Sequence, residues 1–310
     1  MRFKNQFRLP STKKWDLLRG ENLSKFGSRY PDYNELHEYI ADGLVKNWVC
    51  LTNGAEEAVR ICLSEPSFIR RVYFTPTWGL VSVFNNIYGK EIVEIPIQTN
   101  REAFYYNLRK LESNLTGNKE LVYIATPNAN TGSICEVGYI VDLLSRYPDT
   151  TFIIDETYFE FNDHQSVLDF VWKFNNLVVI RSYSKARGLA ANRFGYYVTQ
   201  DKRFINLRPA SPCSVDTIPL VYKADKNYRQ AVELIQLGKN YLEDWLKKEK
   251  CKVFDVKTNF IVFEPTDWIR EAFERKVDFH YVTVEDKNYI KITALPIDMA
   301  VEFVNDIYTY

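Results

Sequence analysis

The sequence predicts an α/β protein: a mainly parallel, doubly wound sheet in a large domain and a small α+β C-terminal domain. Short β-branched and aromatic runs alternate with longer amphipathic stretches, and several of the runs are apolar throughout. Continuous apolar runs suit strands buried on both faces of a parallel sheet, and their alternation with helices is typical of doubly wound folds. After about residue 205 the pattern changes, which indicates the second domain.

The expected elements of the large domain follow in chain order. Strands are expected at 71–75, 91–96, 121–126, 151–155 and 177–182, and helices at 54–64, 78–88, 136–147 and 165–174. Each strand run is short and each helical stretch is longer, as a succession of βα units requires.

The C-terminal third begins with a Pro- and Ser-rich connection at 208–219. A long helix is expected at 225–249, followed by short elements at 258–264, 267–275, 288–294 and 297–308. The predicted boundaries are an N-terminal segment 1–29 packing on the small domain, a large domain 30–207, and a connecting helix with the small domain at 208–310.

Composition excludes several classes of function. The chain has 310 residues with 40 basic and 40 acidic side chains, so neither nucleic acid nor an anionic membrane is expected as a partner. No apolar run approaches the roughly 18 residues of a membrane span, and the N-terminus lacks the apolar stretch of a secretory signal. The five cysteines are scattered and the three histidines lie far apart. We therefore expect reduced thiols, a cytoplasmic location and no metal site.

The segment 177–196 is the most informative for chemistry. An apolar strand ends in Ser182-Tyr183-Ser184-Lys185, and Arg193 follows on the same segment. A lysine beyond a buried strand lies where α/β folds bind ligands, and a partly desolvated lysine suits Schiff-base chemistry. The serines and the arginine suit a phosphate. A surface loop with ordinary charges remains an alternative, and the SxxK match to penicillin-recognising serine enzymes lacks its SDN and KTG companions.

Other strand ends carry polar or aromatic residues. Asp155 closes the strand at 151–155 and could hold a heterocyclic nitrogen protonated, or simply cap a helix. Gly54 opens a helix whose first N–H groups could bind phosphate, although capping alone also explains it. Trp78 follows the strand at 71–75 and could stack on a flat ring or belong to the core. The turn at 126–132 has two amide side chains, a residue type that commonly serves the turn itself. No Walker loop and no G-x-G-x-x-G fingerprint is present.

Taken together, these segments resemble the fold-type-I pyridoxal-phosphate enzymes, in particular histidinol-phosphate aminotransferases and threonine-phosphate decarboxylase. The resemblance covers roughly residues 20 to 295 and rests most on the Ser-x-Ser-Lys segment with Arg193 and on Asp155-x-x-Tyr158. It implies the PLP-transferase fold, pyridoxal 5′-phosphate as cofactor, an amino acid and a 2-oxo acid as substrates, and a homodimer.

The resemblance also implies a role for each matching residue. Lys185 carries the cofactor as a Schiff base and moves the proton, Asp155 pairs with the pyridinium nitrogen, and Tyr158 meets the phenolic oxygen. Trp78 stacks on the ring and borders the substrate. The phosphate is held by Ser182, Ser184, Arg193 and the backbone at Gly54, Ala55 and Glu56, with Tyr30 reaching over from the partner subunit.

Three departures from the family pattern bear on the substrate. Ala129 replaces the asparagine that meets the phenolic oxygen, so that Asn128 or Asn130 would have to substitute. Lys291, in Lys-Ile-Thr, replaces the arginine that binds the substrate carboxylate in a fork, and lysine cannot reproduce that geometry. The stretch between Glu21 and Tyr30 is shorter than in relatives. Arg187, two residues after Lys185, is a spare cation that could compensate for the missing arginine, although we expect it to be an ordinary solvated charge.

The expected activity is transamination between an amino acid and a 2-oxo acid. Two alternatives stay open: a decarboxylase or lyase with the same cofactor, and a cofactor-binding protein without catalysis. Lys291 and Ala129 favour the latter, whereas the near-complete set of cofactor residues argues against it.

Overall fold

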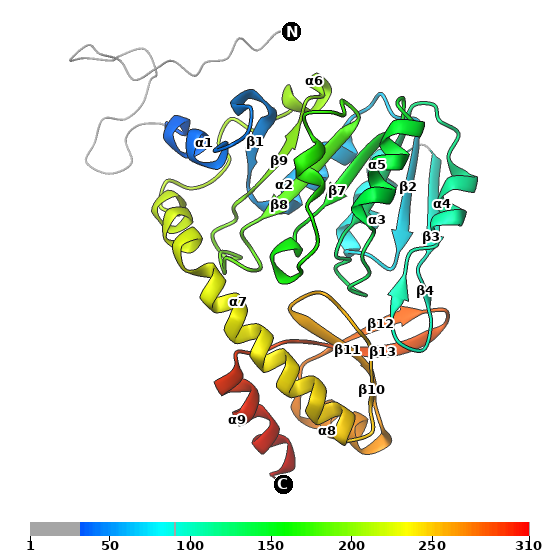
Figure 1. Ribbon diagram of the computed structural model, residues 1–310, viewed down its shortest axis with the longest axis vertical. Helices are drawn as coiled ribbons and strands as arrows, with labels where there is room; N and C mark the ends of the chain where they lie inside the picture. The colour runs from blue at the N-terminus through cyan, green and yellow to red at the C-terminus, as the bar shows by residue number, and fades with distance from the viewer. Residues whose placement is uncertain (1–31, 90, 310) are drawn as a thin grey trace, which may run out of the picture.

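The computed structural model describes residues 32–89 and 91–309 (Figure 1). The larger domain is built on a seven-stranded sheet of order β1-β9-β8-β7-β6-β2-β3. Its strands are β1 (Val49–Thr52), β2 (Arg70–Thr75), β3 (Glu91–Pro96), β6 (Glu120–Ala125), β7 (Thr151–Asp155), β8 (Leu177–Ser182) and β9 (Gly195–Thr199). The pairs from β8 to β3 are parallel, whereas β9 runs antiparallel to both of its neighbours. The predicted mainly parallel sheet is confirmed.

Helices cover both faces of this sheet. One face packs on α2 (Gly54–Ser64), α3 (Gly79–Tyr88) and α6 (Lys202–Ile205). The other packs on α1 (Asn34–Ile40), α4 (Leu108–Asn114), α5 (Val137–Arg146) and the start of α7. Strands β6, β7 and β8 are buried at every residue, which is why the sequence shows them as continuous apolar runs.

The short elements depart most from prediction. The stretch expected as a helix at 165–174 holds only the 3₁₀ helix η3 (Val167–Phe170), and β9 was not expected. Further short elements are the 3₁₀ helices η1 (Lys46–Trp48) and η2 (Phe159–Phe161) and the hairpin of β4 (Gln98–Thr99) and β5 (Phe104–Tyr105).

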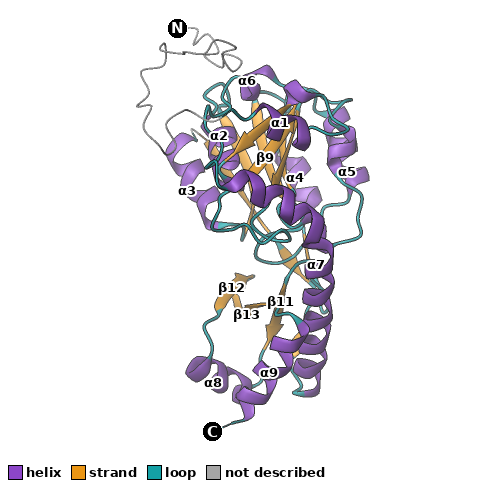
Figure 2. Cartoon of the chain, turned by 90° about the vertical axis from the view of Figure 1, so that its left-hand side faces the viewer, coloured by secondary structure: helices purple, strands orange, loops and turns teal. Residues whose placement is uncertain are grey.

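Helix α7 (Thr217–Lys248) links the two domains. It begins eight residues before the predicted start, because Ile218 and Val221 pack on the core of the larger domain. Figures 1 and 2 show α7 running from the large sheet to the small one, with α9 beside its second half. A Cβ atom at Gly238 would lie 1.9 Å from the carbonyl oxygen of Leu295, so only glycine allows this close approach.

The small domain has a four-stranded antiparallel sheet of order β10-β11-β13-β12. Its elements are β10 (Lys252–Val253), β11 (Phe260–Glu264), α8 (Asp267–Lys276), β12 (His280–Val284), β13 (Lys287–Thr293) and α9 (Ile297–Tyr308). One face of the sheet packs on α7, α8 and α9. No helix in the described ranges is long and apolar enough to cross a membrane.

The loop after β6 contacts the small domain. Gly132 in this loop has φ +69°, and a Cβ atom there would lie 2.5 Å from Cβ of Val256. The carboxyl ends of β6, β7 and β8 therefore lie near the small domain, and the predicted site residues gather there.

Candidate active site

Lys185 lies in the loop that joins β8 to β9. The loop is closed by hydrogen bonds from the N–H of Tyr183 to the carbonyl of Phe194 (3.0 Å) and from the N–H of Gly188 to the carbonyl of Lys185 (3.0 Å). The half-buried Lys185 places its ammonium 5.2 Å from the centre of the Tyr158 ring. The structure thus brings together two residues that the sequence placed on different strand ends.

Asp155 ends β7 and is buried. Its Oδ1 accepts a hydrogen bond from the backbone N–H of Thr157 (2.9 Å), and its Oδ2 accepts one from the hydroxyl of Tyr123 (2.7 Å). Burial raises the pKa of the carboxyl, while the hydrogen bonds from Thr157 and Tyr123 and the positive charge of Lys185 act in the opposite direction. Lys185 is therefore close enough to Asp155 for the two charges to interact.

An anion-binding corner forms where α2 begins. Gly54 has φ +77°, and a Cβ atom there would lie 2.9 Å from Nη2 of Arg193, so the corner requires glycine. Arg193 itself has φ +53° and contacts Glu56 (Nη2 to Oε2, 3.4 Å). At Gly195 a Cβ atom would lie 3.0 Å from the backbone nitrogen of Ala55, so the start of β9 and the start of α2 touch. Free N–H groups at a helix start beside a guanidinium favour a phosphate.

Two serines flank this corner. Ser182 is buried at the end of β8, and its Oγ accepts a hydrogen bond from the N–H of Ser184 (3.1 Å). Thr52 Oγ1 donates to the carbonyl of Gly54 (2.9 Å), which fixes the turn between β1 and α2. Ser182 is opposite Gly195 in the pairing of β8 with β9, and Gly195 touches the backbone of Gly54 and Ala55, so Ser182 lies beside the corner.

The loop at 126–132, which contains Asn128 and Asn130, forms hydrogen bonds with the loop that carries Trp78. Asn128 donates from Nδ2 to the carbonyl of Pro76 (3.2 Å), and Asn130 donates from Nδ2 to the carbonyl of Thr77 (2.5 Å). Asn128 also accepts from the N–H groups of Asn130 (2.8 Å) and Thr131 (3.0 Å), so this amide serves the turn. Trp78, half-buried, directly precedes α3 and packs against the core on that face.

Lys291 is held on the small-domain side. Its ammonium donates to the carbonyl of Ala129 (2.6 Å) and lies 4.2 Å from the centre of the Phe260 ring. Burial, followed by the positive charge of Lys185, lowers the pKa of Lys291 to about 8. The two departures from the family pattern thus contact each other, and Lys291 belongs to the same site as Lys185.

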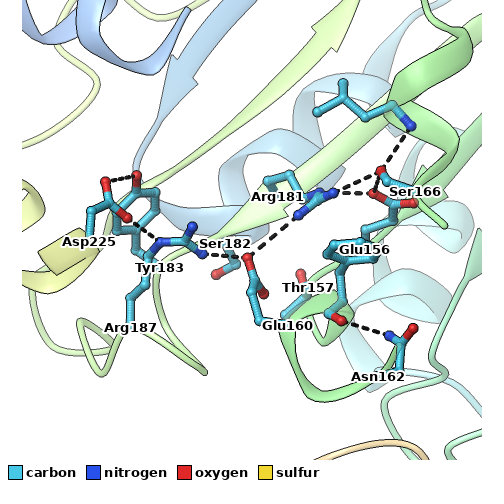
Figure 3. A network of polar contacts seen from close by, with 12 residues as sticks. Glu156, Thr157, Glu160, Asn162, Ser166, Arg181, Ser182, Tyr183, Arg187 and Asp225 are labelled. Carbon is cyan, nitrogen blue, oxygen red and sulfur yellow. Dashed lines mark hydrogen bonds and ion pairs between the residues drawn. The ribbon is translucent and has the colours of Figure 1, made fainter. Parts of the chain in front are cut away.

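A buried ionic network joins the loops that follow β7 and β8 to each other and to helix α7 (Figure 3). Arg181, the residue before Ser182, contacts Glu156 (Nε to Oε2, 2.8 Å) and Ser166 (Nη2 to Oγ, 2.8 Å). Its Nη1 lies 3.5 Å from Oε1 of Glu160, and its guanidinium stacks over the ring of Phe159 at 4.0 Å. Arg181, Glu156 and Glu160 each lie within two residues of a predicted cofactor residue.

Arg187 continues the network and is not the solvated charge that we expected. Its side chain is only 15% exposed; it pairs with Glu160 and with Asp225 on α7 (Nε to Oδ1, 2.5 Å). Its guanidinium lies 4.5 Å from the ring of Tyr183 and 4.4 Å from that of Tyr228. A cation between two carboxylates in a loop is indistinguishable in sequence from a surface charge, because its partners are remote in the chain. Arg187 is committed to this network and does not replace the missing carboxylate fork.

Sequence analysis missed Tyr123 and Phe260 as site residues. Both lie in apolar strand runs, where an aromatic residue is normally core. Only the register of neighbouring strands brings the Tyr123 hydroxyl to Asp155 and the Phe260 ring to Lys291, and only the packing of the two domains brings Phe260 to Tyr158. Tyr30 and the short stretch that precedes it lie outside the described residues.

This combination of lysine, buried carboxylate and anion-binding corner on an α/β sheet defines the class of protein. The chain belongs to the aminotransferase class I and II family, whose model matches residues 27–277; it is a family of pyridoxal-phosphate-dependent transaminases.

Individual known proteins agree with this assignment. The chain is 32% identical over 259 residues to a histidinol-phosphate aminotransferase of Buchnera aphidicola subsp. Schizaphis graminum, covering 77% of this chain and 72% of the relative. The fold is similar to histidinol-phosphate aminotransferase from Sinorhizobium meliloti in complex with pyridoxal-5′-phosphate (TM-score 0.73, 17% identity, 90% and 82% covered). It is also similar to L-threonine-O-3-phosphate decarboxylase from Porphyromonas gingivalis (TM-score 0.70, 18% identity, 90% and 91% covered).

Proposed function

We propose that this protein transfers an amino group between an amino acid and a 2-oxo acid, with pyridoxal phosphate held by Lys185. One observation carries the proposal: Lys185 and the buried Asp155 follow the neighbouring strands β8 and β7, and the corner of Gly54 and Arg193 lies at the same edge of the sheet, where β1 ends and β9 begins. These residues fit the cofactor, because they supply an amine for its aldehyde, a carboxylate for its ring nitrogen and donors for its phosphate.

The roles of the residues follow from their surroundings. When bound, pyridoxal phosphate supplies an electron sink for the substrate α-carbon. Asp155 keeps the ring nitrogen protonated, and Tyr158 donates to the phenolic oxygen. Lys185 takes the proton from the substrate α-carbon and delivers it to the cofactor C4′. Arg193, with Ser182, Ser184 and the backbone at Gly54, Ala55 and Glu56, anchors the phosphate.

The substrate side is assigned to Lys291 and Trp78. Lys291 presents an ammonium that can bind an anionic group of the substrate, a carboxylate or, as the names of the relatives suggest, a phosphate. Ala129 lacks the amide that relatives have at this position, which leaves the phenolic oxygen to Tyr158. The contacts of Asn128 and Asn130 with the carbonyls of Pro76 and Thr77 fix the loop that carries Trp78, the residue that would stack on the cofactor ring.

We further propose a homodimer, in which Tyr30 of one subunit reaches the phosphate of the other, and a cytoplasmic location. The buried, free thiols of all five cysteines support a reducing compartment. Sedimentation of the cofactor-loaded protein tests the dimer, and a loaded monomer would contradict the role of Tyr30.

Near-visible absorbance of the loaded protein tests the reaction. We expect a band from the Lys185-bound cofactor that bleaches with one amino donor, such as histidinol phosphate, and returns with a 2-oxo acid. A band that no amino acid bleaches would contradict transamination, and no band at all would contradict the assignment of Lys185.

Decarboxylation is a second candidate, favoured by one observation. The bond broken at the α-carbon depends on how the carboxylate is held, and Lys291 offers a single ammonium instead of a fork. Carbon dioxide release from an amino acid without any 2-oxo acid would establish this reaction in place of transamination.

A further inference from the structure

Tyr123 is the buried donor that faces Asp155 from the neighbouring strand. In the parallel pairing of β6 with β7, Tyr123 is opposite Ile153 and Ala125 is opposite Asp155. Side chains two residues apart on a strand share a face, so Tyr123 and Asp155 lie on the same side of the sheet. The hydroxyl donates to Oδ2 at 2.7 Å, and both residues are buried.

This hydrogen bond favours the ionised form of the Asp155 carboxyl. A buried carboxyl becomes harder to ionise unless donors stabilise its anion. Burial raises the pKa of Asp155, and the donors that oppose this are Thr157 and Tyr123, together with the nearby charge of Lys185. Tyr123 is a dependable donor, since burial and the neighbouring carboxylate raise the pKa of its hydroxyl well above the ordinary value.

The other titratable groups near this pair do not offer Asp155 the same contact. The hydroxyl of Tyr106 donates to the carbonyl of Ala125, and the thiol of Cys62, on α2, has a pKa raised by burial, so that it stays neutral. The anion of Asp155 therefore depends on the contacts from β6 and from its own loop.

We propose that Tyr123 is a positioning residue, whose hydroxyl holds Asp155 ionised and oriented toward the ring nitrogen of the cofactor. The effect on the cofactor rests on the proposed function, whereas the hydrogen bond between Tyr123 and Asp155 is a property of the protein alone. The two parts can therefore be tested separately.

The first test uses the protein without cofactor and compares urea unfolding at about pH 4 and about pH 8. Loss of the hydroxyl in Tyr123→Phe should raise the proton affinity of Asp155 about tenfold or more, as expected when a hydrogen bond to a charged group is removed. A carboxyl whose folded pKa lies above its unfolded value destabilises the fold only where the unfolded chain is ionised, that is, above about pH 4. The urea concentration at the midpoint of unfolding should thus fall further below that of the parent protein at about pH 8 than at about pH 4.

Tyr197→Phe is the matched control. Tyr197 is also buried, in β9 of the same sheet, but its hydroxyl donates to the carbonyl of Phe204 (2.8 Å), which does not titrate. The decrease in the urea midpoint caused by Tyr197→Phe should be equal at both pH values. In an Asp155→Asn background, the effect of Tyr123→Phe should likewise become independent of pH, which separates the coupling from lost packing.

The second test loads the protein with nitrogen-15-labelled pyridoxal phosphate. In Tyr123→Phe the ring nitrogen signal should move from the protonated toward the unprotonated position, whereas in Tyr197→Phe it should not. Equal midpoint losses at both pH values, with an unmoved nitrogen signal, would overturn the proposal. A pH-dependent loss in a protein that binds no cofactor would uphold the coupling and contradict the proposed function instead.

Discussion

The two ends of the candidate site are built differently. At the cofactor end, Asp155 has two hydrogen-bond donors, and the corner of Gly54 and Arg193 is closed by glycine-dependent contacts. At the substrate end, the Lys291 ammonium contacts one carbonyl and one aromatic ring, and its pKa is lowered to about 8. The cofactor end is therefore preorganised for fixed charges, whereas the substrate end has a cation whose charge depends on pH and on what it binds.

The difference follows from where each end is anchored. The cofactor residues lie at the ends of fully buried parallel strands, over the ionic network of Arg181 and Arg187. Lys291 lies on β13 of the small domain and meets the large domain at a loop. Substitutions at the two ends should consequently affect different measured properties.

Replacing Lys185 should abolish covalent attachment of the cofactor and nearly all turnover. Lys185→Ala should lower turnover on the order of 10⁴-fold, because both the covalent attachment and the proton carrier are lost. Borohydride reduction followed by peptide mass measurement should find the cofactor attached in the parent protein and not in the variant. Lys202→Ala, an exposed lysine at the start of α6, is the control and should keep the attachment.

Breaking the ionic network should destabilise the fold. Arg187→Gln leaves the carboxylate of Asp225 (18% exposed) without its cation and leaves that of Glu160 (7% exposed) with only the longer contact to Arg181 at 3.5 Å. Loss of one partner from a buried ion pair costs roughly 3–5 kcal/mol, which urea unfolding can measure. Arg146→Gln removes a surface cation that is 39% exposed and should lower the stability much less, because solvent screens its ion pairs. Similar costs for both would contradict the buried network.

Removing the guanidinium of the anion corner should weaken cofactor retention. Arg193→Gln should raise the dissociation constant of pyridoxal phosphate about 10- to 100-fold, because a charged hydrogen bond contributes roughly 1.5–3 kcal/mol. Equilibrium dialysis of the cofactor measures this. Arg60→Gln, on the exposed side of the same helix α2, should leave the constant unchanged. Unchanged retention in Arg193→Gln would remove this residue from the phosphate site.

The substrate end should show a pH-dependent KM. Lys291 has a pKa of about 8, so its ammonium is present below that pH and is lost above it. KM for an anionic amino donor should therefore rise as the pH passes through about 8, and Lys291→Met should raise it about tenfold even at neutral pH. Lys291→Arg should remove the rise, since arginine stays charged.

Lys287→Met provides the control for Lys291, because Lys287 lies on the same strand but pairs with Glu264 (2.7 Å) at the surface. It should leave the KM profile as in the parent protein. A flat profile in the parent protein would show that Lys291 does not bind the substrate anion.

Much of the fold could be predicted because buried parallel strands have an unmistakable apolar pattern. The strands at 91–96, 151–155 and 177–182 and the helix at 54–64 match the structure residue for residue. Strand β9 was missed because GYYVT follows the charged, glycine-containing lysine loop, and the helix at 165–174 was wrong because this stretch makes only a 3₁₀ turn. Short elements depend on tertiary packing more than on their own pattern.

The sequence was enough to predict the parallel strands of the sheet, their order along the chain, and the lysine, carboxylate and glycine at three strand ends. Local rules sufficed for these, since hydrophobic periodicity and strand-end position are properties of neighbouring residues. Only the tertiary structure decided that Arg187 is buried, that Tyr123 faces Asp155 and that Lys291 meets Ala129. Each of these contacts joins residues at least 27 positions apart, and the charge state of a side chain depends on burial and neighbours that no local pattern records.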